Sequence, residues 1–227
     1  MNKVINRDKK GGCVISIKEE WPLLLIIIGT LIAGLIFYPH LPEQVASHWN
    51  LRGEVDRYSS RFWGAFGIPI MTAAIYIMMV LLPLIDPRKQ NYQKFAGAYR
   101  LLRAALVVFM TGLYIVIVAD ARGYQMPVGR VVMTGVALLI IVMGNFMGQI
   151  RQNYFVGIKT PWTLANEVVW RKTHRLAARL WVVAGLIGLV AALSGGIAGA
   201  VIMGISLGAA AIIPIVFSYL EFRRQQQ

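Results

Sequence analysis

One stretch of the chain constrains its fold more than any other. Residues 180–220 form a run of 41 residues without a single charged side chain. As one helix this run would be about 60 Å long, which is about twice the thickness of the hydrocarbon core of a membrane. The run must therefore fold back on itself, and Ser194-Gly195-Gly196 offers a turn near its middle.

Four shorter apolar runs precede this stretch, and each is long enough to cross a membrane as a helix. They cover residues 21–38, 63–85, 101–119 and 131–148. Hydrophobic residues make up 57% of the chain, and the charged residues gather between the runs, which is the arrangement that a bilayer imposes. The sequence therefore predicts an all-α, polytopic membrane protein with six transmembrane helices.

The basic residues predict which way the chain crosses the membrane. If the N-terminus is inside, the inner segments hold 18 Lys and Arg residues and the outer segments hold five. Cytoplasmic segments of membrane proteins carry such an excess, so we expect both the N- and C-termini to be cytoplasmic. The net charge of +13 then reflects topology and contact with the anionic lipid bilayer, and we expect no direct nucleic acid binding.

The spans divide the chain into three parts. Residues 1–20 are a basic cytoplasmic tail, and residues 21–85 are the first two transmembrane helices with an outer, extracytoplasmic loop at 39–62. Residues 86–227 hold the other four transmembrane helices, with an inner loop at 149–179.

The six spans hold almost no ionisable group. Arg103 lies within a turn of its helix end, from which we expect its side chain to reach the membrane surface, and Asn145 is the main deeply placed amide. Ion-driven transport usually requires charged or titratable residues inside the membrane, so this pattern disfavours an ion-coupled carrier. A transporter or flippase-like exporter of an apolar or amphipathic cargo remains an alternative.

The sequence also lacks the motifs of membrane enzymes and metal sites. HExxH, GxSxG and glycine-rich phosphate loops do not occur, so we expect no catalytic activity. His48, Glu54 and Asp56 are possible metal ligands, but an outer loop ordered by hydrogen bonds explains them as well. We therefore predict neither a metal nor a cofactor. Cys13 is the only cysteine in the sequence, so an internal disulfide cannot form.

The outer loop contains a turn signal. Asn50-Leu51-Arg52-Gly53 has Asn at the first and Gly at the last position, as tight turns favour. Apolar residues on both sides of the turn favour a loop that closes as a small hairpin or as a turn-linked cap. Its aromatic side chains are the residue type that dominates contact energy in interfaces, so this loop is a candidate binding surface.

The inner loop contains a second signal, which is a helix with a charged stripe. Thr163 is a plausible N-cap for a helix that begins near Leu164. Glu167 and the three arginines that follow at steps of four residues lie on one face of that helix. The pattern predicts an amphipathic inner helix along the membrane surface that runs into the fifth span.

Two motifs resemble known families. The inner segment NYFVGIKTPWTLANEVVWRKTHRLAARLW resembles the signature of the SdpI family of bacterial membrane proteins. The outer segment LPEQVASHWNLRGEVDRYSSR resembles the small N-terminal domain of unknown function that often precedes it. The resemblance implies an immunity protein that gives resistance to a secreted antimicrobial peptide or toxin at the bacterial cytoplasmic membrane. It also implies signal transduction by sequestering an ArsR-type winged-helix repressor.

These implications assign two sets of candidate residues. The surface that faces the toxin peptide comprises His48, Trp49, Asn50, Gly53, Asp56 and Tyr58. The inner family motif, at which a repressor would dock, comprises Asn153, Tyr154, Gly157, Thr160, Pro161, Trp162, Thr163, Glu167, Trp170, Arg171, Thr173, His174 and Arg175.

Overall fold

The computed structural model describes residues 17–227, so most of the predicted tail at 1–20 lies outside the described residues. Six long helices dominate it: α1 (Ile17–Phe37), α2 (Arg61–Ile85), α3 (Ala96–Ala121), α4 (Val128–Met147), α6 (Glu167–Ser194) and α7 (Gly196–Arg224). All six are long and apolar enough to cross a membrane. The prediction of an all-α, multi-pass cell membrane protein with six transmembrane helices is confirmed.

Short elements connect the helices. They are η1 (Tyr38–His40), β1 (Gln44–Trp49), β2 (Val55–Ser60), η2 (Lys89–Phe95) and α5 (Pro161–Ala165). The strands β1 and β2 pair antiparallel as a two-stranded hairpin, as the turn signal in the sequence predicted.

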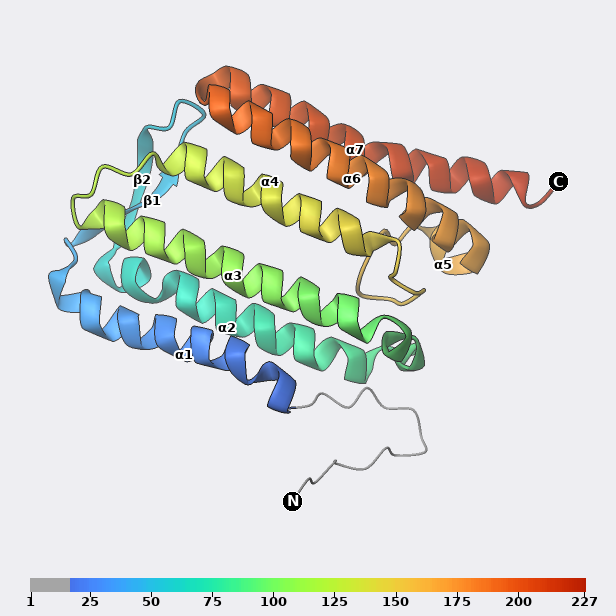
Figure 1. Ribbon diagram of the computed structural model, residues 1–227, viewed down its shortest axis with the longest axis horizontal. Helices are drawn as coiled ribbons and strands as arrows, with labels where there is room; N and C mark the ends of the chain where they lie inside the picture. The colour runs from blue at the N-terminus through green and yellow to red at the C-terminus, as the bar shows by residue number, and fades with distance from the viewer. Residues whose placement is uncertain (1–16) are drawn as a thin grey trace.

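The six helices run nearly side by side as an elongated bundle (Figure 1). Helices α1, α2 and α3 pack on one another, α3 packs on α4, and α6 packs between α4 and α7. We name the two ends of the bundle by what they carry. The hairpin end carries β1 and β2, and the motif end carries the motif segment, which is residues 148–166 between α4 and α6.

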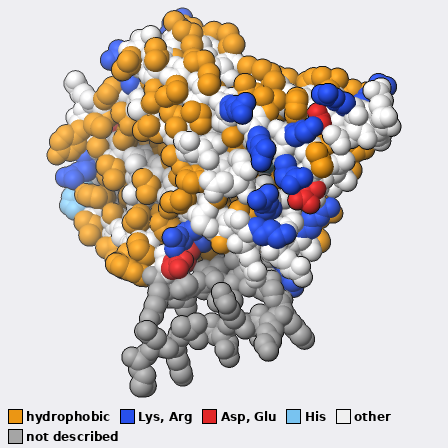
Figure 2. All heavy atoms as spheres, turned by 45° about the vertical axis from the view of Figure 1, so that its right-hand side comes forward, with side chains coloured by type: hydrophobic (Ala, Val, Ile, Leu, Met, Phe, Trp, Pro, Cys, Tyr) orange, Lys and Arg blue, Asp and Glu red, His pale blue; other side chains and the backbone are white. Residues whose placement is uncertain are grey.

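The basic residues are distributed unequally between these ends. Arg52, Arg57, Arg61, Arg122 and Arg130 are at the hairpin end. Lys and Arg side chains gather on the motif end, which Figure 2 turns toward the viewer. The first residues of α1 and the C-terminus lie at this same end, as an even number of spans requires. These positions fit the predicted orientation, which stays a prediction.

The fold-back of the long uncharged run is at the predicted place. Helix α6 ends at Ser194 and α7 begins at Gly196, so one residue separates them. Gly195 and Gly196 have φ angles of 62° and 57°, a backbone conformation that glycine adopts without strain. Arg130 of α4 covers this turn, since a Cβ on Gly195 would lie 2.9 Å from its Nε atom.

The predicted inner helix differs from the structure in where it starts. Thr160, not Thr163, is the N-cap, and it caps only the short helix α5. Pro161 explains this start, because proline suits the first helical position, where no N–H is needed. A second cap, Asn166, then starts α6, whose first turns carry the charged stripe. The stripe therefore lies on the first turns of α6, which continues as the fifth candidate span.

The expectation that Arg103 reaches the membrane surface is wrong. Only 5% of Arg103 is exposed, and its guanidinium forms an ion pair with Glu20, which is 3% exposed. Tyr76 donates a hydrogen bond to the second carboxylate oxygen of Glu20 at 2.9 Å, and Tyr99 lies under the guanidinium. The first turn of α1 thus supplies a buried partner for Arg103, which the sequence of the span that contains Arg103 does not reveal.

Candidate functional site

The turn of the hairpin is held by Asn50. The N–H of Gly53 donates to the Asn50 carbonyl at 2.9 Å, which closes the predicted tight turn. The Asn50 side-chain oxygen accepts from the N–H groups of Arg52 and Glu54, at 2.8 and 3.1 Å. Gly53 has a φ of 83°, so the turn requires glycine at this position. Asn50 and Gly53 therefore shape the tip.

The hairpin is fixed to the bundle on one side. Val45 is 1% exposed and contacts Gly64 of α2 so closely that a Cβ there would lie 2.6 Å from a Val45 methyl. Leu41 and Ala65 complete this small core. The tip approaches α4, because a Cβ on Gly129 would lie 3.7 Å from the Gly53 Cα atom. The hairpin is therefore a fixed cap and not a loose connection.

The opposite side of the hairpin is open. Tyr58 is 57% exposed, and Trp49 is half-buried. His48 and Asp56 form an exposed pair across the two strands, with 2.5 Å between Nδ1 and Oδ1. Such an exposed pair contributes about 1 kcal/mol or less, so it orders the surface more than it stabilises the fold. All six candidate residues of the outer set thus lie together on one small hairpin.

The motif segment is organised around Asn153, which is completely buried. Its amide nitrogen donates to the carbonyls of Arg151 and Val156, at 2.8 and 2.9 Å. Its oxygen accepts from the N–H groups of Phe155 and Val156, at 2.9 and 2.6 Å. One side chain therefore satisfies a loop backbone that has no regular secondary structure.

Asp86, at the end of α2, connects this loop to α2. It is 2% exposed and accepts a hydrogen bond from the N–H of Tyr154 at 2.9 Å. It also accepts from the Tyr92 hydroxyl at 3.0 Å, and that hydroxyl is 3.3 Å from the Asn153 oxygen. Arg88 lies over the ring of Tyr154. A charge next to a proline at the end of a span was the only signal for Asp86 in the sequence.

His174 holds the other side of the loop. It is fully buried and stacks on Trp170, with 4.1 Å between the ring centres. The N–H of Ile158 donates to Nε2 at 3.0 Å, so this nitrogen carries no proton and the ring is neutral. Nδ1 then carries the proton and donates to the Trp170 carbonyl at 2.9 Å. Next to the ring is Gly157, where an added Cβ would lie 2.4 Å from Nε2.

Further contacts connect the motif segment to α7. The hydroxyls of Thr160 and Ser218 are 3.0 Å apart, and Thr163 donates to the carbonyl of Ile158 at 2.8 Å. On the adjacent surface, Lys172 of α6 donates to Glu221 of α7 at 2.6 Å. Sequence reasoning did not identify Ser218 or Glu221, because their partners are about 50 residues away or more.

The structure divides the thirteen motif residues by exposure. The buried side chains are those of Asn153, Thr160, Thr163, Trp170, Thr173 and His174. Gly157 and Trp162 are half-buried, and Tyr154, Pro161, Glu167, Arg171 and Arg175 are exposed. The exposed charges lie in the first turns of α6, next to the motif segment. A docking surface can therefore use only part of the motif, since the buried part builds the loop.

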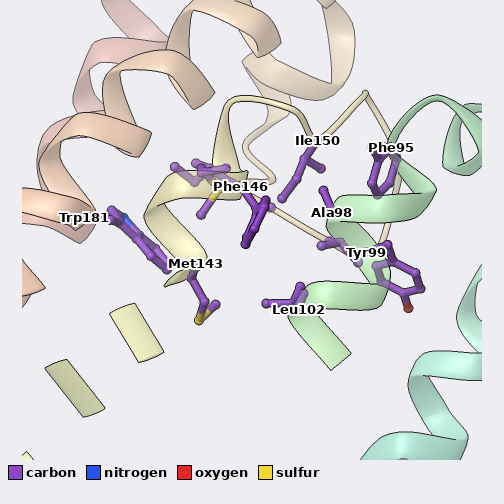
Figure 3. A pocket seen from close by; sticks show the side chains of 12 residues that line it. Phe95, Ala98, Tyr99, Leu102, Met143, Phe146, Ile150 and Trp181 are labelled. Atoms are coloured by element: carbon purple, nitrogen blue, oxygen red, sulfur yellow. The ribbon is translucent and has the colours of Figure 1, made fainter. Parts of the chain in front are cut away.

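A small apolar cavity lies beneath the loop (Figure 3). Its volume is about 150 Å³, and side chains from η2 and α3, from α4 and from α6 surround it. Tyr99 and Leu102 line one side, and Met143, Phe146 and Trp181 line the other. Val156, Gly157 and Ile158 of the motif segment close it. The cavity thus lies where α3, α4, α6 and the motif segment meet.

Metal binding has no support in the part of the chain that the structure describes. Among residues 17–227, no three His, Cys, Asp or Glu side chains are grouped to hold an ion. The outer residues His48 and Asp56 bond to each other instead. The arrangement offers two surfaces for binding, at opposite ends of the bundle.

In comparisons with known proteins, one matched region contains the hairpin and the other contains most of the motif segment together with α6. Residues 149–218 match the SdpI/YfhL protein family, and residues 25–73 match a domain of unknown function, DUF1648. The chain is 26% identical over 164 residues to the immunity protein SdpI of Bacillus subtilis (strain 168), which covers 72% of this chain and 76% of that relative. No solved structure matches the chain. The resemblance to the SdpI family is confirmed.

Proposed function

We propose that this chain, which carries the SdpI-family region at residues 149–218, protects a bacterial cell membrane against a secreted antimicrobial peptide. The observation that carries the proposal is the similarity to the B. subtilis immunity protein, which extends over about three quarters of both chains. Protection by binding requires no reacting group, in keeping with the lack of catalytic motifs in the sequence. The proposed activity is therefore non-enzymatic.

The hairpin is the proposed contact surface for the peptide. A secreted peptide arrives from outside, and the basic residues predict that the hairpin end is outside. Trp49 and Tyr58 are rigid aromatic side chains on a scaffold that Val45 fixes to α2. The basic and acidic residues of the hairpin nearly balance, so aromatic contact rather than net charge would supply the affinity.

Resistance measurements with hairpin variants test this proposal. The chain is expressed in a sensitive bacterium that is challenged with a panel of secreted antimicrobial peptides. Trp49→Ala should weaken peptide binding by about 2 kcal/mol, or about 30-fold, and lower the tolerated peptide concentration. Trp21→Ala is the matched control, because Trp21 is 55% exposed at the opposite end of the bundle. Membrane levels of both variants are measured by immunoblot.

Deletion of residues 43–60 tests the proposed contact surface separately from the proposed immunity function. If the full chain protects and the deletion protects equally well, the hairpin is not the contact surface. If the full chain protects against no peptide in the panel, the proposed immunity function is wrong.

The exposed part of the motif supports a second role, in signal transduction. Arg171 and Arg175 lie on one exposed face of α6 at the end that is predicted to be cytoplasmic. A small winged-helix repressor of the ArsR type would dock there through acidic side chains, and its retention at the membrane would relieve repression. The motif loop next to this face contacts α2, α6 and α7, so a change in helix packing would reach it.

A further inference from the structure

A groove between α1 and α3 is not used by either loop. Its volume is about 480 Å³, and it extends from the middle of both helices to the hairpin end. On α1 it is lined by Gly29, Thr30 and Ala33, whose small side chains leave the space, and by Phe37 at its end. We propose that this groove binds the helix of an amphipathic peptide that inserts into the membrane from the hairpin end.

Two hydroxyl groups in the groove indicate a polar partner. Tyr114 is only 2% exposed, and its hydroxyl has no hydrogen-bond partner within residues 17–227. The Thr111 hydroxyl is buried in the same groove and is likewise unpaired in the described chain. A buried hydroxyl without a partner is costly in an apolar environment. The acyl chain of a lipid cannot satisfy it, but a Ser, Thr, Asn or Gln side chain on a bound helix can.

Arg122 supplies a positive charge at the open end of the groove. It is exposed, it caps the C-terminus of α3, and it lies over the ring of Phe37. Tyr114 is eight residues earlier on the same helix, which places it about 12 Å deeper. The groove therefore complements a helix that has an acidic group near its outer end and a hydrogen-bonding side chain about two turns further in.

This inference rests on the proposed function, because the natural occupant would be the membrane-inserted helix of the toxin. The hairpin and the groove share the hairpin end, with Arg122 at the groove opening. A peptide could thus contact the hairpin first and then place its helix against α1 and α3. Binding in the groove would keep that helix from assembling with other copies in the bilayer.

Gly29 provides a substitution that fills the groove without disturbing the bundle. No described atom lies within 4 Å of a Cβ built at Gly29, although the residue lines the groove. Gly29→Leu therefore places a side chain in the space that the peptide helix would occupy, and it also favours the helical conformation. Gly112→Leu is the matched control, since Gly112 is exposed on α3, has the same free space and does not line the groove.

Tyr114→Phe tests the hydrogen bond separately from the space. The change removes an unpaired hydroxyl, so the thermal stability of the free protein should be unchanged or higher. The bound helix would lose one hydrogen bond, which should weaken its binding about three- to ten-fold. A role in folding alone would lower the stability and leave binding unchanged, which would contradict the proposal.

The experiment uses the full chain in phosphatidylcholine nanodiscs and a fluorescent, 20-residue helical peptide. The peptide carries one Glu near its end and one Asn two turns further in, and a matched peptide has Leu at both positions. We expect the Glu/Asn peptide to bind more tightly than the Leu peptide. Gly29→Leu should weaken its binding at least ten-fold, and Gly112→Leu should leave it unchanged.

Three outcomes would overturn the proposal. The first is equal binding to the wild type and to Gly29→Leu, and the second is equal binding of the two peptides. The third is a phospholipid that copurifies with the wild type but not with Gly29→Leu, and that the peptide does not displace. This result would identify the groove as a site for a lipid acyl chain. Because these measurements need no resistance assay, a chain that fails to protect cells would refute the proposed function without deciding the groove.

Discussion

The hairpin and the motif segment are both connections between transmembrane helices, but their polar residues serve different purposes. On the hairpin, His48 bonds to Asp56 and Asn50 bonds to Glu54 at the surface. In the motif segment, Asn153 and His174 are fully buried and bond to the loop backbone. Apart from Asn50, which also holds its own turn, the hairpin thus presents its polar side chains outward, whereas the motif uses its most distinctive side chains to build itself.

The comparison shows that a distinctive sequence motif need not be a contact surface. A long loop at a helix end has many N–H and carbonyl groups that require partners, and buried side chains supply them here. Substitutions of the motif residues that build the loop should therefore lower stability, whereas substitutions of exposed hairpin side chains should lower binding. The following measurements test this difference, from the largest expected effect to the smallest.

Cysteine labelling tests the sidedness of the two ends, and its result is all-or-none. In a chain whose Cys13 is replaced by Ser, new cysteines directly after His48 and near Gly123 should react with a membrane-impermeant maleimide added outside. Cysteines in place of the exposed Lys89 and Lys172 should react only after the membrane is opened. Labelling from outside at Lys172 would reverse the assignment of the two ends.

Gly157→Val should be the most damaging single change in the motif. Gly157 has a φ of 108°, and a Cβ would lie 2.4 Å from His174 Nε2. Strain and overpacking together should lower the free energy of unfolding by about 3 kcal/mol or more, measured by thermal unfolding in detergent. Gly204→Ala is the control, since a Cβ at Gly204 has open space among the described residues. Equal unfolding temperatures for the two variants would contradict the reading of the motif as a structural element.

Two neighbouring ion pairs at the motif end test how strongly the burial of an ion pair affects stability. The Glu20–Arg103 pair has side chains that are 4% and 6% exposed, whereas those of Glu19–Arg100 are 58% and 44% exposed. Glu20→Gln leaves a buried charge without its partner and should lower the free energy of unfolding by about 3 kcal/mol. Glu19→Gln should cost about 1 kcal/mol or less. Similar losses would show that the first turn of α1 does not bury Glu20.

Reversal of the exposed stripe should have the smallest effect on stability. The double variant Arg171→Glu, Arg175→Glu changes two exposed side chains, so we expect little change in unfolding temperature or membrane level. Each lost basic contact with anionic lipid is worth about 1 kcal/mol, and a docked repressor with acidic side chains would be repelled. A reporter gene under the repressor should therefore stay repressed. Normal induction would show that the stripe has no role in docking.

The sequence predicted much of this molecule, for reasons that are local. Apolar run length and the Gly195 turn determined the six helices, and Asn50 and Gly53 determined the hairpin. The Glu20–Arg103 pair was not predicted, because it joins residues 83 positions apart on different helices. The role of Asp86 as acceptor for Tyr154 was not predicted for the same reason. Periodicity identifies the faces of a helix, but it does not identify the residues of another helix that lie against them.

The single-residue turn between α6 and α7 has a consequence for how the chain is made. An outer connection between two transmembrane helices usually contains polar side chains, which must cross the bilayer when the helices insert. The connection between α6 and α7 is Gly195 alone, which has no side chain. We therefore expect α6 and α7 to enter the membrane together, as one preformed helical pair, after the first four helices are in place. A cysteine in place of the exposed Ser194 should then be inaccessible from outside in a chain that is truncated after this residue, whereas it should be labelled from outside in the complete chain.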